Sequence, residues 1–230
     1  MLVKEAKGET MEKKIEPRVK GETSEKKAQI SAPNFKLATF VLTGNSDYVS
    51  NKFSDEAKNQ MKAKQEAGAQ GKKGVKREPK DFDKACLGAM HCFKDGTAGI
   101  PASCFRQAMI SACRLVGFKM TLAKLALFVE ADGADVSEGA PLVRITGSWR
   151  RVDSYVRNET GVADIRPRPH WDPGWQVRVR VRYDADLFMS TDVENLLLRV
   201  GMQVGIGAGR PDSKESAGQG WGTFDVEKVD

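Results

Sequence analysis

The sequence predicts an α+β fold, and three observations support this prediction. Residues 176–183 alternate between polar residues and valine or tyrosine, which is the period of a half-buried strand. Apolar residues recur every three or four positions in 101–116 and in 191–200, as in amphipathic helices. The chain has 230 residues, 40% of them hydrophobic, and can bury one sizeable core. We therefore expect a single domain over 34–230, after a mobile Lys/Glu-rich tail over 1–33.

The first strand is expected at Phe35–Thr43, which is rich in residues typical of strands and is followed by turn residues. Residues 51–80 then carry nine Lys or Arg against four Asp or Glu, and their centre has almost no apolar side chains. This composition predicts an inserted basic arm that reaches along a nucleic acid or over a neighbouring subunit. A solvated helix from Ser54 to about Ala67, followed by a disordered loop, is the alternative. The contacts expected from the arm are Lys72, Lys73, Lys76 and Arg77.

A helix is expected to begin at Pro101, because a proline at the first helical position lacks only an N–H that would have no partner. Its apolar face ends at Gly117. Ser103 lies near the N-terminus, where its hydroxyl group can either bind a phosphate with help from the helix dipole or cap the helix. Arg106 lies on another face and is a second candidate contact. The next expected elements are a helix or strand over 122–129 and a strand over 141–146.

Residues 149–175 mix five arginines and a histidine with four aromatic residues. Arginine interleaved with aromatic rings suits single-stranded nucleic acid, because phosphates pair with guanidinium groups while bases stack on the rings. Three prolines predict that much of this segment is irregular loop. Arg150 and Arg151 are the contacts that we expect from it.

The strand over 176–183 places valines on one face and arginines on the other. Neighbouring arginines repel one another unless an anion covers them, so this face is a candidate track for phosphates. A solvated edge strand that uses charge to prevent aggregation is the alternative. The three arginines are Arg178, Arg180 and Arg182. A helix is expected next, with a capping box at Thr191–Glu194 and its end at Gly201.

Residues 201–222 contain seven glycines and lead into an alternating strand at Trp221–Val226. Glycine adopts positive φ freely and allows close approach, so the main-chain N–H groups of such a loop can face a phosphate. A flexible hairpin between two strands is the alternative, although linkers favour Ser and Thr over aromatic residues. The contacts expected from the loop are Gly207, Gly209, Arg210, Gly218, Gly220 and Trp221.

The composition indicates which kinds of partner, cofactor and compartment to expect. A net charge of +6 and an isoelectric point near 9.1 favour an anionic partner. The four cysteines have neither the spacing of a zinc site nor the density of a disulfide scaffold, so we expect reduced thiols, no metal and no cofactor. No apolar run approaches the length that spans a bilayer, and the N-terminus lacks the apolar stretch of a signal peptide. We expect a cytoplasmic protein without a membrane partner.

A family resemblance rests on three segments, Ile100–Ala108, Gly205–Arg210 and Gly218–Val226. They resemble the RAMP superfamily, the repeat-associated RNA-binding proteins of CRISPR effector complexes, and most of all the backbone subunits of these complexes. The resemblance covers residues 34–50 and 98–226. It implies a ferredoxin-like, RRM-like core, with an antiparallel sheet that carries helices on one face. It also implies that the first segment and the glycine-rich loop contact the sugar-phosphate backbone of RNA, and that the inserted arm protrudes as a thumb.

We therefore expect a protein that binds single-stranded nucleic acid, RNA more than DNA, and that oligomerises along it as a repeating subunit of a CRISPR-effector-like assembly. Two alternatives are a phage-type annealing protein, which would pair single DNA strands in recombination, and a structural assembly protein. We expect no enzyme, because no catalytic histidine or aspartate of the RNA-cleaving RAMP proteins can be matched. A metal-independent ribonuclease that uses His91 or His170 is the remaining alternative.

Overall fold

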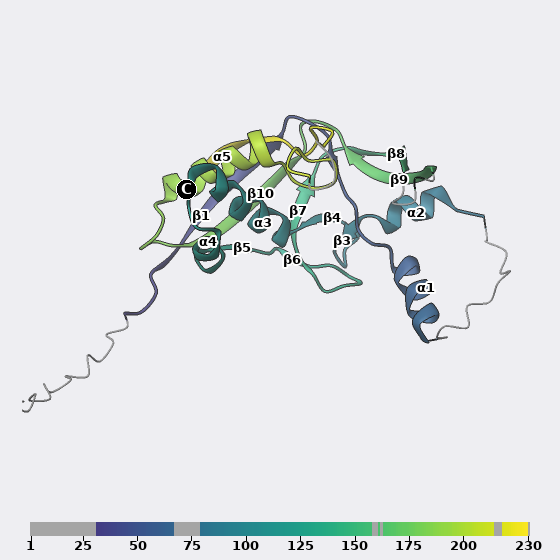
Figure 1. The fold of residues 1–230 in the computed structure, drawn as a ribbon, viewed down its shortest axis with the longest axis horizontal. Helices are drawn as coiled ribbons and strands as arrows, with labels where there is room; N and C mark the ends of the chain where they lie inside the picture. Colours follow the sequence, from purple (N-terminus) through teal and green to yellow (C-terminus); the bar gives the residue numbers. More distant parts are fainter. Residues whose placement is uncertain (1–30, 67–78, 158–160, 162, 214–217, 230) are drawn as a thin grey trace, which may run out of the picture. The chain divides into compact units, whose positions relative to one another are not determined.

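The computed structural model of the chain confirms the α+β class: helices accompany a mostly antiparallel sheet (Figure 1). The structure describes residues 31–66, 79–157, 161, 163–213 and 218–229. Nearly all of the predicted N-terminal tail lies outside these residues, and the unit described below spans Pro33–Asp230. None of the described helices combines the length and the apolar character that crossing a bilayer requires.

The main sheet is built around one long strand pair. β1 (Phe35–Gly44) and β10 (Gln176–Asp184) run antiparallel over nine residue pairs. β11 (Phe224–Val229) pairs with the free side of β1, whereas β5 (Leu127–Glu130) and β7 (Pro141–Thr146) both pair with β10. The short strands that continue the sheet from β7 are β4 (Ala98–Pro101), β3 (His91–Cys92) and β6 (Gly133–Ala134). The order along the four strands nearest the centre is β11-β1-β10-β5.

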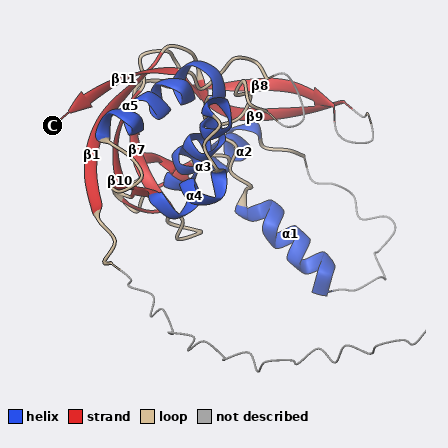
Figure 2. Cartoon of the chain, turned by 60° about the vertical axis from the view of Figure 1, so that its left-hand side comes forward, coloured by secondary structure: helices blue, strands red, loops and turns tan. Residues whose placement is uncertain are grey.

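Three helices lie together on one side of this sheet (Figure 2). They are α3 (Ala102–Ala112), α4 (Met120–Ala126) and α5 (Ser190–Arg199). Period two puts the valines of β10 on the helix side, where they are buried together with Phe40 of β1, Phe105 of α3 and Leu197 of α5. The arginines of β10 therefore lie on the sheet face opposite to the helices. This outcome confirms the predicted strand over 176–183, and β1 and β7 also match their predicted ranges.

Helices α3 and α5 are each followed directly by a further helical turn of another type. A 3-10 turn, η1 (Cys113–Val116), extends α3 to Gly117, and a π-helical turn, η2 (Val200–Val204), extends α5 to Gly205. The predicted end of the second helix at Gly201 is wrong. Gly201 lies inside η2, and a Cβ there would overlap the Phe224 carbonyl oxygen, so this glycine permits close packing against β11.

The helix starts also differ slightly from the prediction. The capping box predicted at Thr191–Glu194 is wrong, because α5 begins at Ser190 and the backbone N–H of Met189 donates to Asp192 Oδ2 at 2.7 Å. Pro101 is the last residue of β4 and precedes α3, whose first residue is Ala102. Trp221 lies in the glycine-rich loop, and the last strand begins only at Phe224.

A second sheet contains β2 (Tyr48–Val49), β9 (Ala163–Trp171) and β8 (Trp149–Arg157). The irregular loop predicted for 149–175 is therefore wrong, since most of it is a β-hairpin. Prolines are compatible with β9 because the backbone N and the carbonyl O of one residue point to the same side of a strand. The Pro169 carbonyl accepts from the Ser50 N–H at 3.2 Å on the side of β2, so its missing N–H leaves the ladder to β8 intact.

Residues 51–80 are partly helical, as the alternative prediction expected. α1 (Asp55–Glu66) precedes a stretch outside the described residues, and α2 (Phe82–Gly88) follows it. The first residues of the predicted arm belong to the core: Lys52 is buried, and its N–H donates to the Ala89 carbonyl at 3.0 Å. Lys72, Lys73, Lys76 and Arg77 lie outside the described residues, so their role stays a prediction.

Candidate functional site

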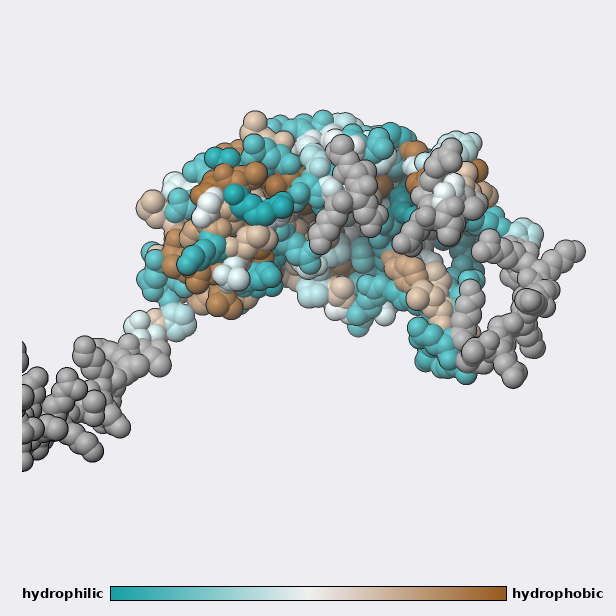
Figure 3. Space-filling model, in the orientation of Figure 1, coloured by the Kyte–Doolittle hydropathy of each residue, from teal (hydrophilic) through white to brown (hydrophobic). Residues whose placement is uncertain are grey.

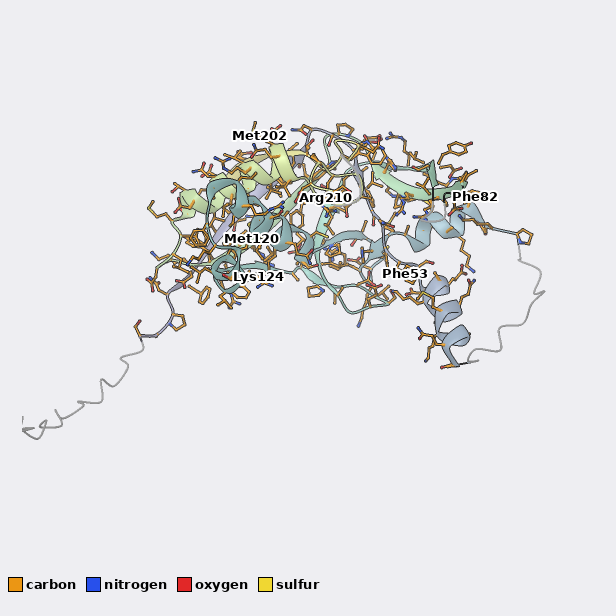
Figure 4. The ribbon with its side chains drawn as sticks, in the orientation of Figure 1. Phe53, Phe82, Met120, Lys124, Met202 and Arg210 are labelled. Carbon is orange, nitrogen blue, oxygen red and sulfur yellow. The ribbon has the colours of Figure 1, made fainter. Side chains whose placement is uncertain are left out.

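A pocket of about 460 Å³ lies where the glycine-rich loop meets α3. The loop contributes residues 205–208, Arg210 and Asp212, and the turn after β2 contributes Ser50 and Asn51. Figure 4 shows Arg210 on the loop beside α3. The side of α3 that faces the pocket carries Cys104, Gln107 and Ser111. The fold thus brings together two segments that the sequence singled out, the start of the helix after Pro101 and the loop before the last strand.

A clasp between the loop and the end of α3 fixes the shape of the pocket. Asp212 accepts hydrogen bonds from the Ser111 hydroxyl at 2.6 Å and from the Arg114 guanidinium at 2.9 Å. The Ser111 hydrogen bond, helped by Arg114, holds the pKa of Asp212 below its usual value, so this carboxylate is ionised at neutral pH. Because two side chains of one helix hold the same loop residue, the loop is positioned before any ligand arrives.

The pocket is lined by amide and cationic donors together with one carboxylate, Asp212, whose charge is offset by its ion pair with Arg114. Asn51 and Gln107 carry amide N–H groups, and Arg210 carries a guanidinium that donates one hydrogen bond to the Gly207 carbonyl at 3.2 Å. Burial raises the pKa of the Cys104 thiol to about 11, so this cysteine is uncharged and a poor nucleophile at neutral pH. Such donors suit a phosphate or another oxyanion.

The glycines of the loop pack against their own chain. Gly207 has a φ of +77°, and a Cβ there would lie 2.7 Å from the Val49 carbonyl oxygen. A Cβ at Gly209 would overlap the Trp221 ring, and one at Gly218 would overlap the Arg210 carbonyl. The loop and β2 therefore fill the space on the Cβ side of these glycines, and the contact of their main-chain N–H groups with a phosphate stays a prediction. Gly220 differs, since a Cβ there would meet nothing within 4 Å.

The two contacts predicted near the start of α3, Ser103 and Arg106, do not line the pocket. Ser103 is exposed and is not one of the pocket's lining residues, and α3 has no side-chain cap. Arg106 donates from Nε to the Leu127 carbonyl at 2.8 Å and also donates to the Lys124 carbonyl. Its guanidinium stacks over the Phe128 ring at 4.9 Å. Arg106 therefore ties α3 to the junction of α4 and β5.

Acidic residues accompany the arginines of β8. Arg150 pairs with Asp47 at 3.0 Å and with Asp172. Arg151 pairs with Asp153 at 3.2 Å and with Asp83 of α2. The pairs with Asp47 and Asp83 join the hairpin to its surroundings, and all four pairs neutralise much of the positive charge that the sequence suggested.

Trp221 packs against the β8–β9 hairpin. Its ring meets the His170 ring edge-on, with centroids 4.9 Å apart. His170 is buried on β9 and lies 3.2 Å from Asp47 through Nδ1. Trp221 is therefore half-buried in a contact within the chain, with part of its ring still exposed.

The arginine row of β10 is separate from the pocket, because it lies on the opposite face of the sheet. β10 is an interior strand, so the alternative of a solvated edge strand is wrong. Arg180 pairs with Asp132 at 3.2 Å, and Arg182 stacks over Phe35 and Phe128 at 5.5 and 5.2 Å. The Arg178 side chain is exposed and makes no hydrogen bond or ion pair with any residue that the structure describes.

A buried charged cluster lies beside the pocket. Lys52 Nζ is 2.9 Å from Asp135 Oδ1, and the two side chains are 5% and 0% exposed. His91, which lines the pocket, is 3.1 Å from Asp135 Oδ2 through Nδ1. Burial by itself would raise the pKa of Asp135, but hydrogen bonds from Lys52, Ser137 and Glu138 hold this pKa well below its usual range. Burial lowers the pKa of His91, so its ring is neutral at neutral pH.

The sequence analysis missed Asn51 and Gln107 as parts of the site. Gln107 had a signal: Cys104, Gln107, Ser111 and Arg114 recur every three or four residues and form a polar stripe on the predicted helix. Asn51 had none, because only the fold brings the turn after β2 next to α3.

A scan against protein-family models finds no match for the chain, and a search of curated proteins finds none either. Within the described residues, no group of three or more His, Cys, Asp or Glu side chains is arranged to hold a metal ion. The case for a function therefore rests on the geometry of the pocket and on the resemblance stated above.

The two histidines predict a loss of stability in mild acid. Burial lowers the pKa of both His91 and His170, and the nearby carboxylates of Asp135 and Asp47 only partly oppose this. Below roughly pH 6.5, the unfolded chain binds protons that the folded chain excludes, so the free energy of unfolding falls as the pH drops. Urea midpoints measured on both sides of this pH should show the loss, and His170→Gln should reduce it. A loss of the same size in the variant would contradict a role for His170.

Proposed function

We propose that this chain binds single-stranded nucleic acid, RNA in preference to DNA, through its sugar-phosphate backbone at the pocket between α3 and the glycine-rich loop. The observation that carries the proposal is that the glycine-rich loop, the segment after β2 and α3 each contribute a hydrogen-bond donor to the same pocket. Arg210, Asn51 and Gln107 present cationic and amide donors on a surface that the Asp212 clasp holds in place. A phosphodiester matches such donors because its oxygens only accept hydrogen bonds.

The topology supports a ferredoxin-like core, as the resemblance implies. The four strands of such a core would be β1, β5, β10 and β11 in chain order, and their order in the sheet is β11-β1-β10-β5. α3 lies between β1 and β5 in the chain, and α5 lies between β10 and β11. The remaining elements are then insertions, which include α1, α2 and the β8–β9 hairpin.

The resemblance further suggests a repeating subunit of a CRISPR-effector-like assembly in the cytoplasm, in which the inserted arm contacts RNA or a neighbouring subunit. The same pocket chemistry would suit a protein that anneals single DNA strands. Binding to RNA and to DNA of one sequence, with annealing of complementary DNA as a further readout, separates these two functions. A structural assembly protein would bind neither strand at moderate salt.

Arg210→Gln should weaken binding of a fluorescently labelled single-stranded RNA and should lower its salt dependence. If the guanidinium neutralises one phosphate, the slope of log affinity against log salt falls by about 0.7 for a single strand. Fluorescence anisotropy over a salt series measures this slope. The fold should persist, because within the described residues the Arg210 side chain donates one hydrogen bond, to the Gly207 carbonyl.

Two controls remove the same charge elsewhere. Lys124→Gln, on α4, should leave the slope unchanged (Figure 4). Arg178→Gln tests the opposite sheet face, which the sequence predicts as a phosphate track, and it should also leave the slope unchanged. A lower slope for Arg178→Gln with no change for Arg210→Gln would move the binding surface to that face and overturn the assignment to the pocket.

A further inference from the structure

The helical layer holds a second hollow, which is larger and more apolar than the pocket at the glycine-rich loop. This groove of about 870 Å³ runs between the end of α3 and the α5–η2 segment. Its apolar walls are Val116 and Phe118 after α3, Leu187 and Phe188 before α5, and Leu198 and Met202 on α5–η2. Apolar surface gathers around α5 and α4 in the space-filling view (Figure 3).

Several of these apolar side chains are highly exposed, and they lie next to one another. Met202 is 75% exposed, Val116 49% and Leu187 43%. Figure 4 shows Met202 at the outer surface beside α5. A contiguous apolar patch with a hollow and a projecting flexible side chain is typical of a protein interface.

The charges along α5 indicate what occupies the groove. Asp192 lies in the first turn of α5 and Arg199 is its last residue, and both line the groove. They are seven residues apart, which is about two turns, so they lie on one face roughly 10 Å apart. Within the described residues Arg199 has no carboxylate partner, and its one hydrogen bond goes to Gln203.

We infer that the groove is the interface of a two-fold dimer, in which the α5 helices of two copies pack antiparallel. A two-fold interface uses the same patch on both copies, so the patch must complement itself. Antiparallel packing places Asp192 of each copy against Arg199 of the other. It also places Met202 of each copy at the groove of the other. The inference goes beyond nucleic-acid binding and does not depend on it.

This geometry fixes which residue lies at the two-fold axis. The midpoint between Asp192 and Arg199 falls next to Asn195, which is exposed and lines the groove. Asn195 of one copy therefore lies near Asn195 of the other. Thr191 is also exposed, but it lies about 7 Å along the helix from the axis, so its two copies are roughly 14 Å apart. Disulfides form only when the two Cα atoms are within about 7 Å.

The test uses the full chain after nuclease treatment, so that nucleic acid cannot link two copies. Wild type should sediment as a dimer of the 25.3 kDa chain. Asn195→Cys should form a reducible covalent dimer on mild oxidation, whereas Thr191→Cys should not. Oxidised wild type controls for the native thiols, none of which is paired in the structure.

A second arm of the test needs no new cysteine. Met202→Lys should raise the dimer dissociation constant at least tenfold with an unchanged melting curve of the monomer. Met61→Lys is the matched control on α1, where the methionine is 50% exposed and lies outside the groove. If the wild type is a monomer at every concentration, the dimer is overturned and the groove is assigned to another protein. Equal cross-linking by Thr191→Cys and Asn195→Cys overturns the antiparallel arrangement.

Discussion

Gly222→Ala is expected to destabilise the protein by about 2–5 kcal/mol, the sum of a positive-φ cost of roughly 1–2 kcal/mol and an overpacking cost of roughly 1–3 kcal/mol. Gly222 has a φ of +72°, and a Cβ there would overlap the Ile206 carbonyl oxygen. Its N–H donates to the Asp47 carbonyl at 2.7 Å, and its carbonyl accepts from the Ile206 N–H at 3.0 Å. The backbone therefore cannot shift away from the clash without losing hydrogen bonds. Urea unfolding measures the effect.

Gly220→Ala is the matched control, because Gly220 has nearly the same φ, +74°, and open space around it. It should show the conformational cost alone, so the difference between the two variants measures the clash. Equal midpoints would mean that the loop relaxes around the new methyl group. Since Gly222 joins the loop to the turn that follows β1, the same variant should also weaken nucleic-acid binding at the pocket if the proposed function holds.

Asp135→Ala should cost about 3–5 kcal/mol, the usual range when one member of a buried ion pair is removed. The variant leaves the Lys52 ammonium buried with no carboxylate partner among the described residues. It also removes the acceptor for the N–H groups of Ser137 and Glu138 at 2.9 and 3.0 Å. The urea midpoint of the variant gives the loss. The double variant Lys52→Met with Asp135→Leu should recover part of it, because the unpaired charge is then gone.

Asp95→Ala is the control for this experiment, since Asp95 also pairs with a cation, Arg144, at 2.7 Å. That pair is largely exposed, so its removal should change the midpoint far less. The folded-state pKa of Asp135 is depressed, so its contribution is complete above the unfolded value of about 3.9 and is lost as the pH falls below it. An acid transition identical in wild type and Asp135→Ala would contradict the assignment.

The elements with a clear period were predictable from the sequence. β10 shows an unbroken alternation of valine and arginine, and α3 shows an apolar stripe between Pro101 and Gly117. The β8–β9 hairpin was not predictable, because its prolines and arginines resemble a loop until the partner strands are known. The period of β10 predicts which residues share a face of the strand, but it does not predict whether the strand lies inside the sheet or at its edge.

The site was only partly predictable, for a physical reason. The carboxylates that pair with the arginines predicted to bind nucleic acid are distant from them in the sequence. Asp47 and Arg150 are 103 positions apart, and Asp83 and Arg151 are 68 apart. Only the fold shows that these cations are already paired. The positive φ values of the glycine-rich loop were foreseeable, but the residues that fill the space beside Gly207 and Gly209 were not.

The chain leaves the core after β2 and returns to it at the same point. The Lys52 N–H and the Ser50 hydroxyl both donate to the carbonyl of Ala89, at 3.0 and 2.8 Å. Since these bonds hold the ends of the excursion together, its length is nearly free to vary. Each doubling of a flexible loop costs only about 0.6 kcal/mol in closure entropy. We therefore expect a change in chain length between Lys52 and Ala89 to leave the sheet undisturbed.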